Sequence, residues 1–155
     1  MTEPPTPRLE LIFTAEVSVD PPLDFGDVAK GTRRIVPITG GEFSGPKIRG
    51  KVLPGGADWQ ILRSDGVSEL EARYTLKTDD GALINVRNLA LRHGPPDVMA
   101  ALAAGRVVEP GSYYFRGATF FETGDARHGW ITKCIVVCSG EREPSGVKLN
   151  FYRVL

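Results

Sequence analysis

Two side chains of this sequence, Asp58 and His93, have the chemistry of a general acid/base pair. A carboxylate moves protons when its surroundings shift its pKa, and histidine titrates close to neutral pH. Asp58 lies in Pro54-Gly-Gly-Ala-Asp-Trp59, and His93 lies in Leu91-Arg-His-Gly-Pro95. Glycine and proline beside each residue indicate turns, where Asp58 could equally bond its own backbone and His93 could face solvent. We keep both residues as catalytic candidates.

A second group of side chains could bind a small anionic or aromatic ligand. Tyr114 and Arg116 are two residues apart in an aromatic-rich run, so they share one face if that run is a strand. Trp59 is either a core residue or a ring that stacks on a ligand at a pocket mouth. The predicted ligand-binding residues are Trp59, Arg73, Arg87, Tyr114, Arg116 and Glu122.

The two arginines of this group belong to a predicted hairpin. The segments Ser68–Thr78 and Ala82–Leu89 flank Asp79-Asp-Gly81, which suits a three-residue loop with glycine in the left-handed conformation. That register places apolar residues opposite one another on one face, as expected for a buried side: Tyr74, Leu76, Ile84 and Val86.

On the other face of this hairpin the same register sets Arg73 directly opposite Arg87. Like charges in a cross-strand pair are destabilising unless an anion lies between them. Glu71 is available on the same face as an internal partner. Two interpretations follow: a solvated outer face, or a polar barrel interior whose arginines bind an anionic ligand bidentately.

The segments that must position these residues are mostly short strands. Runs with strand-like alternation are Leu9–Val19, Thr32–Ile38, Lys47–Leu53, Gln60–Arg63, Ser68–Thr78, Ala82–Leu89, Tyr113–Glu122, Trp130–Ser139 and Val147–Leu155. Pro95–Gly105 has the proline start, alanine-rich middle and glycine end of a short helix. We predict an all-β fold, a single antiparallel β-barrel of about eight to ten strands with one short α-helix. It would span residues 9–155 after a flexible lead-in at 1–8.

The composition excludes several classes of protein. The 155 residues carry 19 basic and 19 acidic side chains, so no basic excess is available to bind nucleic acid or an anionic membrane surface. No apolar run approaches the roughly 18 residues that span a bilayer. The first residues lack the basic and apolar regions of a secretory signal, which predicts a cytoplasmic protein.

The two cysteines, Cys134 and Cys138, are predicted to be free thiols. On a strand their Cα atoms would lie about 13 Å apart, whereas a disulfide needs roughly 7 Å or less. The two histidines form no metal-binding motif, so we expect no metal ion and no cofactor.

Several motifs together resemble one family. They are Arg34–Gly41, Pro54–Gln60, Ala72–Gly81, Asn88–Pro95, Tyr113–Arg116, Phe121–Thr123 and Tyr152–Val154. Their combination resembles the domain-of-unknown-function 3237 family, also called uncharacterised protein family 0311. The resemblance implies a small bacterial or fungal protein with a single β-barrel, and it brings no agreed activity and no catalytic residue.

These observations lead to three hypotheses about function. The first is a barrel that binds a small, carboxylated or aromatic metabolite at its mouth. The second is an enzyme of aromatic or secondary metabolism that uses acid/base residues such as Asp58 and His93. The third is an oligomeric structural barrel without a ligand, and an exposed strand edge would allow a homodimer in any of the three.

Overall fold

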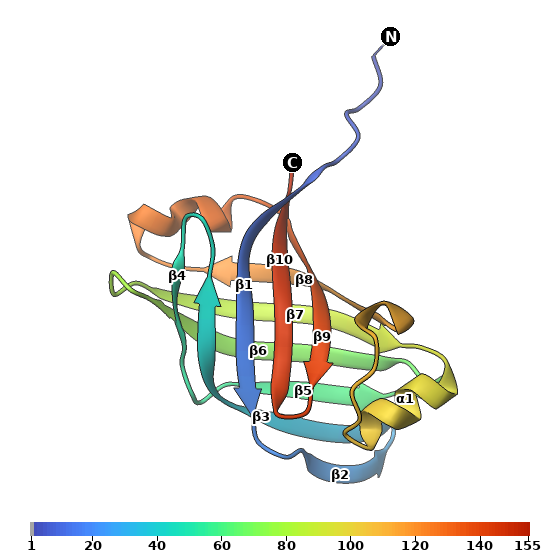
Figure 1. Ribbon diagram of the computed structural model, residues 1–155. Helices are drawn as coiled ribbons and strands as arrows, with labels where there is room; N and C mark the ends of the chain where they lie inside the picture. Colours follow the sequence, from blue (N-terminus) through green and yellow to red (C-terminus); the bar gives the residue numbers. More distant parts are fainter. Residues whose placement is uncertain (1) are drawn as a thin grey trace.

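The computed structural model describes residues 2–155, whose ten strands form one antiparallel sheet, most of which closes into a β-barrel (Figure 1). The strands are β1 (Leu9–Val19), β2 (Leu23–Val28), β3 (Gly31–Ser44), β4 (Arg49–Val52), β5 (Ala57–Leu62), β6 (Ser68–Thr78), β7 (Leu83–His93), β8 (Tyr114–Glu122), β9 (Val136–Glu143) and β10 (Gly146–Val154). This architecture confirms the predicted fold class. Met1 belongs to the predicted lead-in and lies outside the described residues.

The barrel closes because its first strand pairs on both sides. β1 pairs with β10, and the order continues through β9, β8, β7 and β6. β4 and β5 each bridge β6 and β3, and β3 pairs back with β1. Closure satisfies the backbone groups that an open sheet edge would expose. Within the described residues, β2 pairs with β3 alone and lies at the outside of the ring.

The alternation of apolar and polar residues predicts most of the strands but not all of the residues at which they begin and end. β2 has no counterpart among the predicted segments, because all of its residues are exposed and none supplies a buried face. The predicted strand Trp130–Ser139 begins only at Val136. Before it, a 3₁₀ helix η2 (Ala126–Thr132) forms, and Asp125 caps it by accepting the backbone N–H of Arg127.

The helical prediction is confirmed. Helix α1 spans Pro96–Ala103, starts with proline in its first turn and buries Leu102, while Val98 and Met99 pack against the core. It follows the end of β7, and a short 3₁₀ helix η1 (Pro110–Ser112) leads into β8. No helix among residues 2–155 is long and apolar enough to cross a membrane.

The β6–β7 hairpin has the predicted register. Thr78 donates its backbone N–H to the carbonyl of Ala82 at 2.9 Å, and Gly81 has a φ of 90°, which suits the left-handed position of the loop. The predicted apolar face points into the barrel, with Tyr74, Leu76, Ile84 and Val86 buried. The polar face, including the pair Arg73 and Arg87, therefore lies outside.

Packing differs along the barrel interior. One part is filled by an aromatic cluster in which the ring of Phe13 lies 5.4 Å from Phe43, 6.0 Å from Phe121 and 4.5 Å from Phe151. Farther along the same strands the inward residues become smaller or polar, and the interior is hollow there. The filled part stabilises the barrel, and the hollow part is where a ligand can be held.

Candidate functional site

The hollow part of the barrel is a cavity of about 470 Å³. This volume lies within the range of small-molecule sites. Most of its wall is apolar, formed by Val17, Val36, Ile38, Leu70, Ala72, Ala90, Phe115, Val147 and Leu149. Exposed residues of the β1–β2 loop (20–22) and the β9–β10 turn (143–145) surround its opening. The cavity is therefore an apolar chamber that is open to solvent at one side.

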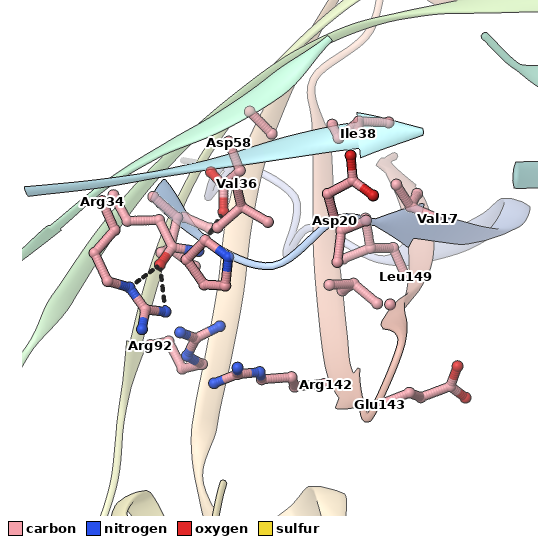
Figure 2. Close-up of a pocket in the computed structure, with 18 of the residues that line it drawn as sticks. Val17, Asp20, Arg34, Val36, Ile38, Asp58, Arg92, Arg142, Glu143 and Leu149 are labelled. Atoms are coloured by element: carbon pink, nitrogen blue, oxygen red, sulfur yellow. Dashed lines mark hydrogen bonds between the residues drawn. The ribbon is translucent and has the colours of Figure 1, made fainter. Parts of the chain in front are cut away.

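The positive charge of this chamber comes from three arginines, Arg34 of β3, Arg92 of β7 and Arg142 of β9. Its acidic residues are Asp58 and, at the opening, Asp20 and Glu143. Figure 2 shows Arg34, Arg92 and Arg142 on one side of the cavity, with Val17, Ile38 and Leu149 on the other. The backbone N–H of Arg142 donates to the hydroxyl of the buried Tyr113 at 2.8 Å, which connects β9 to the residue just before β8. The arginines thus make one polar end in an otherwise apolar site.

Arg92 is the most deeply placed of these cations, with only 6% of its surface exposed. Its guanidinium lies 5.4 Å from the centre of the Phe115 ring. Burial, followed by repulsion from Arg142, lowers the pKa of Arg92 to about 10. Burial and the charge of Arg34 likewise lower the pKa of Arg142. Both pKa values fall because the guanidinium groups are withdrawn from solvent and repel one another. An anion close to them in the cavity would oppose both effects.

Asp58 faces this cluster from β5. Its Oδ2 accepts a hydrogen bond of 2.8 Å from Nε2 of Gln60, while Oε1 of Gln60 accepts from Nη2 of Arg34 at 3.0 Å. The amide of Gln60 therefore connects a guanidinium to the carboxylate. Burial raises the pKa of Asp58 to about 6, although the hydrogen bond from Gln60 and the charges of Arg92 and Arg34 act in the opposite direction.

Three residues that line this cavity each carry a buried polar atom without a hydrogen-bond partner within residues 2–155, namely Asp58 Oδ1, Tyr74 Oη and Arg92 Nε. Burial also raises the pKa of the Tyr74 phenol, so this hydroxyl keeps its proton. A buried polar group without a partner costs about 1–3 kcal/mol. Several unpartnered polar atoms around one cavity are expected where a polar ligand supplies the missing hydrogen bonds.

Of the predicted site residues, all of which the structure describes, Asp58 alone lines the cavity. Asp58 and Gln60 point inward, so the intervening Trp59 points outward and lies in a surface groove with Arg33 and Leu89. His93 is exposed at the end of β7, next to the inward Arg92. The barrel wall thus separates Asp58 from His93, and the structure does not bring this expected pair together.

The remaining predicted residues lie on the outer surface. The ring of His93 stacks on Tyr114 at 5.0 Å, and the guanidinium of Arg116 lies 5.7 Å from the same Tyr114 ring. Glu122 accepts a hydrogen bond of 2.7 Å from the side chain of Asn85. These side chains belong to the solvent-facing side of the sheet, because they alternate with the buried residues of β7 and β8.

The pair Arg73 and Arg87 has the register predicted for it, but on the outside of the barrel. Glu71 lies between the two side chains, with Oε1 at 3.0 Å from Arg87 and Oε2 at 3.4 Å from Arg73. The hydrogen bond from Arg87 contributes most to lowering the pKa of Glu71. The carboxylate of Glu71 therefore compensates the two like charges, as the sequence suggested it would.

Most polar residues that line the cavity were not among the predicted site residues, and they include Arg34, Gln60, Arg92 and Arg142. A usable signal existed for Arg92. The alternation Ile84, Val86, Asn88, Ala90 and Arg92 continues without a break, and every one of these residues is buried. Extending the predicted strand past Leu89 places Arg92 inside the barrel.

The potential metal ligands and the cysteines are dispersed over the described residues. Among residues 2–155 there is no group of three histidine, cysteine or acidic side chains that could hold a metal ion. Cys134 and Cys138 are both free, as the sequence predicted, and burial raises the pKa of each thiol.

Comparison with known proteins decides the family. The sequence pattern of the family described as "Protein of unknown function (DUF3237)" matches residues 7–154. The chain belongs to this family. A UPF0311 protein of Clostridium acetobutylicum is 42% identical over 146 residues, which are 94% of this chain and 92% of the relative. A crystal structure of a conserved protein of unknown function from Rhodopseudomonas palustris is 38% identical, with a TM-score of 0.93 over 99% of this chain and 100% of that one.

A more distant relative of this DUF3237 protein has a named activity. The "Hydroalkoxylation enzyme phnH" of Penicillium herquei is 30% identical over 89 residues, which are 57% of this chain and 59% of the relative. That match covers little more than half of either protein.

Proposed function

We propose that this protein binds a small organic anion, a carboxylated or aromatic metabolite, in the barrel cavity. The observation that carries the proposal is the buried Arg92, whose Nε lacks a partner within residues 2–155 and whose pKa is lowered by burial and by Arg142. A carboxylate accepts hydrogen bonds from guanidinium groups and neutralises their charge, so it would stabilise this arrangement.

The shape of the cavity supports a ligand with an apolar part as well. The aliphatic side chains of Val17, Ile38 and Leu149 form an apolar wall opposite the charged end, and the ring of Phe115 lies beside Arg92. An aromatic ring would bury its surface against this wall while its acidic group reaches the arginines. A short inorganic anion would leave most of the roughly 470 Å³ unfilled.

The proposal is tested by calorimetry and thermal shift with benzoate, phenylpyruvate and the neutral analogue benzamide. We expect the carboxylates to bind and to raise the melting temperature, and benzamide to bind at least tenfold more weakly. Arg92→Met should weaken carboxylate binding by tenfold or more. Arg87→Met removes the same charge from the outer surface and serves as the matched control, with affinity unchanged.

Two results would overturn this proposal. The first is the absence of binding by either carboxylate, which would favour a structural barrel without a ligand. The second is an equal loss of affinity in Arg92→Met and Arg87→Met, because that would assign the effect to overall charge. Circular dichroism of both variants verifies that the barrel is intact.

The named activity of the Penicillium herquei relative favours an enzyme as the second candidate. Hydroalkoxylation adds the O–H bond of an alcohol across a carbon–carbon double bond, so that oxygen bonds to one carbon and the proton is delivered to the other. The cavity described above has a carboxyl group suited to that task in Asp58.

A further inference from the structure

We infer that Asp58 is a catalytic acid/base that moves a proton on a ligand whose anionic group is held by the cavity arginines. The inference rests on the proposed function, because it needs an organic anion in the same site. It adds a reaction class, proton transfer next to a carbonyl group, and a substrate class, small carboxylates that carry an enolisable carbonyl.

The two oxygens of Asp58 have different surroundings. Oδ2 is fixed by the hydrogen bond from Gln60, and Gln60 is itself held by Arg34. Oδ1 is buried, and no partner for it exists in the part of the chain that the structure describes. One oxygen is thus anchored while the other keeps an unused hydrogen-bonding capacity, in a residue that lines the cavity, as a positioned base requires.

Among the titratable groups around it in the cavity, Asp58 is the one suited to carry a proton. Arg34 of β3 and Arg142 of β9 line the cavity together with Arg92 of β7, whose pKa of about 10 keeps it protonated at neutral pH. The acidic side chains of Asp20 and Glu143 are exposed at the opening of the cavity. Tyr74 of β6 lines the same cavity, but burial raises its pKa away from neutrality. Asp58, with a pKa of about 6, is the group here that exchanges a proton near physiological pH.

The proposed step balances without an oxidant, a reductant or a second substrate. The carboxylate of Asp58 takes a proton from the carbon next to a carbonyl of the ligand. The C–H electron pair forms a carbon–carbon double bond, and the carbonyl electrons move to oxygen. A nearby guanidinium stabilises that enolate oxygen. Asp58 then returns its proton to carbon, or to oxygen after rearrangement.

The test measures deuterium exchange into the benzylic carbon of phenylpyruvate in D₂O by NMR, with binding measured in parallel. This probe has a carboxylate, an aromatic ring and an enolisable ketone. We expect the wild-type protein to accelerate exchange over buffer, with a rate that rises with pH through about 6 as Asp58 ionises. Asp58→Asn should reduce the accelerated rate by about 10²-fold or more while binding is kept.

Two further variants complete the design. Asp58→Glu restores a carboxylate and should recover part of the exchange, whereas a purely structural role for Asp58 would be served as well by asparagine. Arg87→Met is the outer-surface control and should leave exchange unchanged.

Each outcome has a separate meaning. Binding of phenylpyruvate without accelerated exchange overturns the catalytic role and leaves the binding proposal in place. Equal exchange in the wild type and Asp58→Asn also overturns it. Failure to bind phenylpyruvate while benzoate binds refutes enolisable carboxylates as the substrate class. Failure of both carboxylates to bind overturns the binding proposal, and the catalytic inference with it.

Discussion

Gln60 lies two residues after Asp58 on β5 and donates a hydrogen bond of 2.8 Å to its carboxylate, and both side chains point into the barrel. The bond favours the ionised carboxylate, yet burial outweighs it and raises the pKa of Asp58 to about 6. The protein therefore keeps a carboxyl group in an environment that opposes its charge. Such a group lowers the stability of the fold, and groups kept at this cost cluster at functional sites.

The first prediction concerns the pH dependence of stability at Asp58. The native pKa of about 6 exceeds the ordinary aspartate pKa of 3.8, so the native state binds more protons than the unfolded chain between these pH values. The favourable contribution of the protonated form is complete below pH 3.8 and is lost as pH rises through about 6. Asp58→Asn should therefore be more stable than the wild type at pH 7.5, by about 1–3 kcal/mol.

Urea unfolding at several pH values between 4 and 8 measures this difference. The gap in unfolding free energy between Asp58→Asn and the wild type should widen with pH and level off above about pH 7. Comparing the two proteins at each pH cancels the contributions of the other carboxylates. A gap that stays constant across this range would show that Asp58 has an ordinary pKa in the folded protein.

The outer pair Arg73 and Arg87 shows how far the sequence alone could be interpreted. Alternation of apolar residues determined the register, and the register set these two arginines opposite each other with Glu71 between them. The sequence pattern alone did not determine which face of the hairpin points into the barrel, because that depends on how the other strands close around it. The inward face turned out to be the apolar one.

The second prediction follows from that outer cluster. Glu71→Gln removes the carboxylate between Arg73 and Arg87 and leaves two like charges directly opposite. The fold should lose about 0.5–1 kcal/mol at low salt, and less at high salt because the repulsion is screened. Adding Arg87→Met to Glu71→Gln should restore part of the loss. Chemical denaturation of the single and double variants measures both effects. A double variant that is no more stable than Glu71→Gln alone would contradict this explanation.

The cavity residues were harder to foresee for a physical reason. Arg34, Arg92 and Arg142 come from β3, β7 and β9, and only barrel closure brings these strands around one chamber. Local patterns predict which face of a strand is buried, but they do not reveal where the interior is left unfilled. The unfilled region is set by the sizes of side chains from several strands together.

The third prediction uses a glycine beside the cavity. A Cβ atom added at Gly140 would lie 2.8 Å from two carbons of the Phe115 ring, which lines the cavity. Gly140→Ala should push that ring, lower the free energy of unfolding by about 1–3 kcal/mol and weaken binding of benzoate. Gly124 has nothing within 4 Å of the corresponding atom, so Gly124→Ala is the matched control. Equal stability of the two variants would refute the close contact.

The fourth prediction concerns the free thiols. Cys138 is 1% exposed and Cys134 is partly buried, and burial raises the pKa of both. Because the thiolate is the reactive form, both residues should react slowly with iodoacetamide at pH 7.5 in the native protein. Unfolding in urea should expose both to rapid labelling, as counted by mass spectrometry. Rapid labelling of Cys138 in the native state would contradict its burial.

The last prediction separates the hollow part of the barrel from the filled part. Ala72 lines the cavity, whereas Ala15 is 0% exposed within the packed core. Ala72→Leu should change the unfolding free energy by less than about 1 kcal/mol, because its new atoms enter empty space. Ala15→Leu should cost about 1–3 kcal/mol or more, because its atoms must displace neighbours.

The same pair of variants tests where the ligand lies. Ala72→Leu occupies part of the chamber next to Asp58, which it faces across the β5–β6 pairing, and should weaken benzoate binding by tenfold or more. An outer-surface substitution of similar size, Ala118→Leu, should leave the affinity unchanged because Ala118 is exposed. If Ala72→Leu binds benzoate as tightly as the wild type does, the ligand does not enter the barrel.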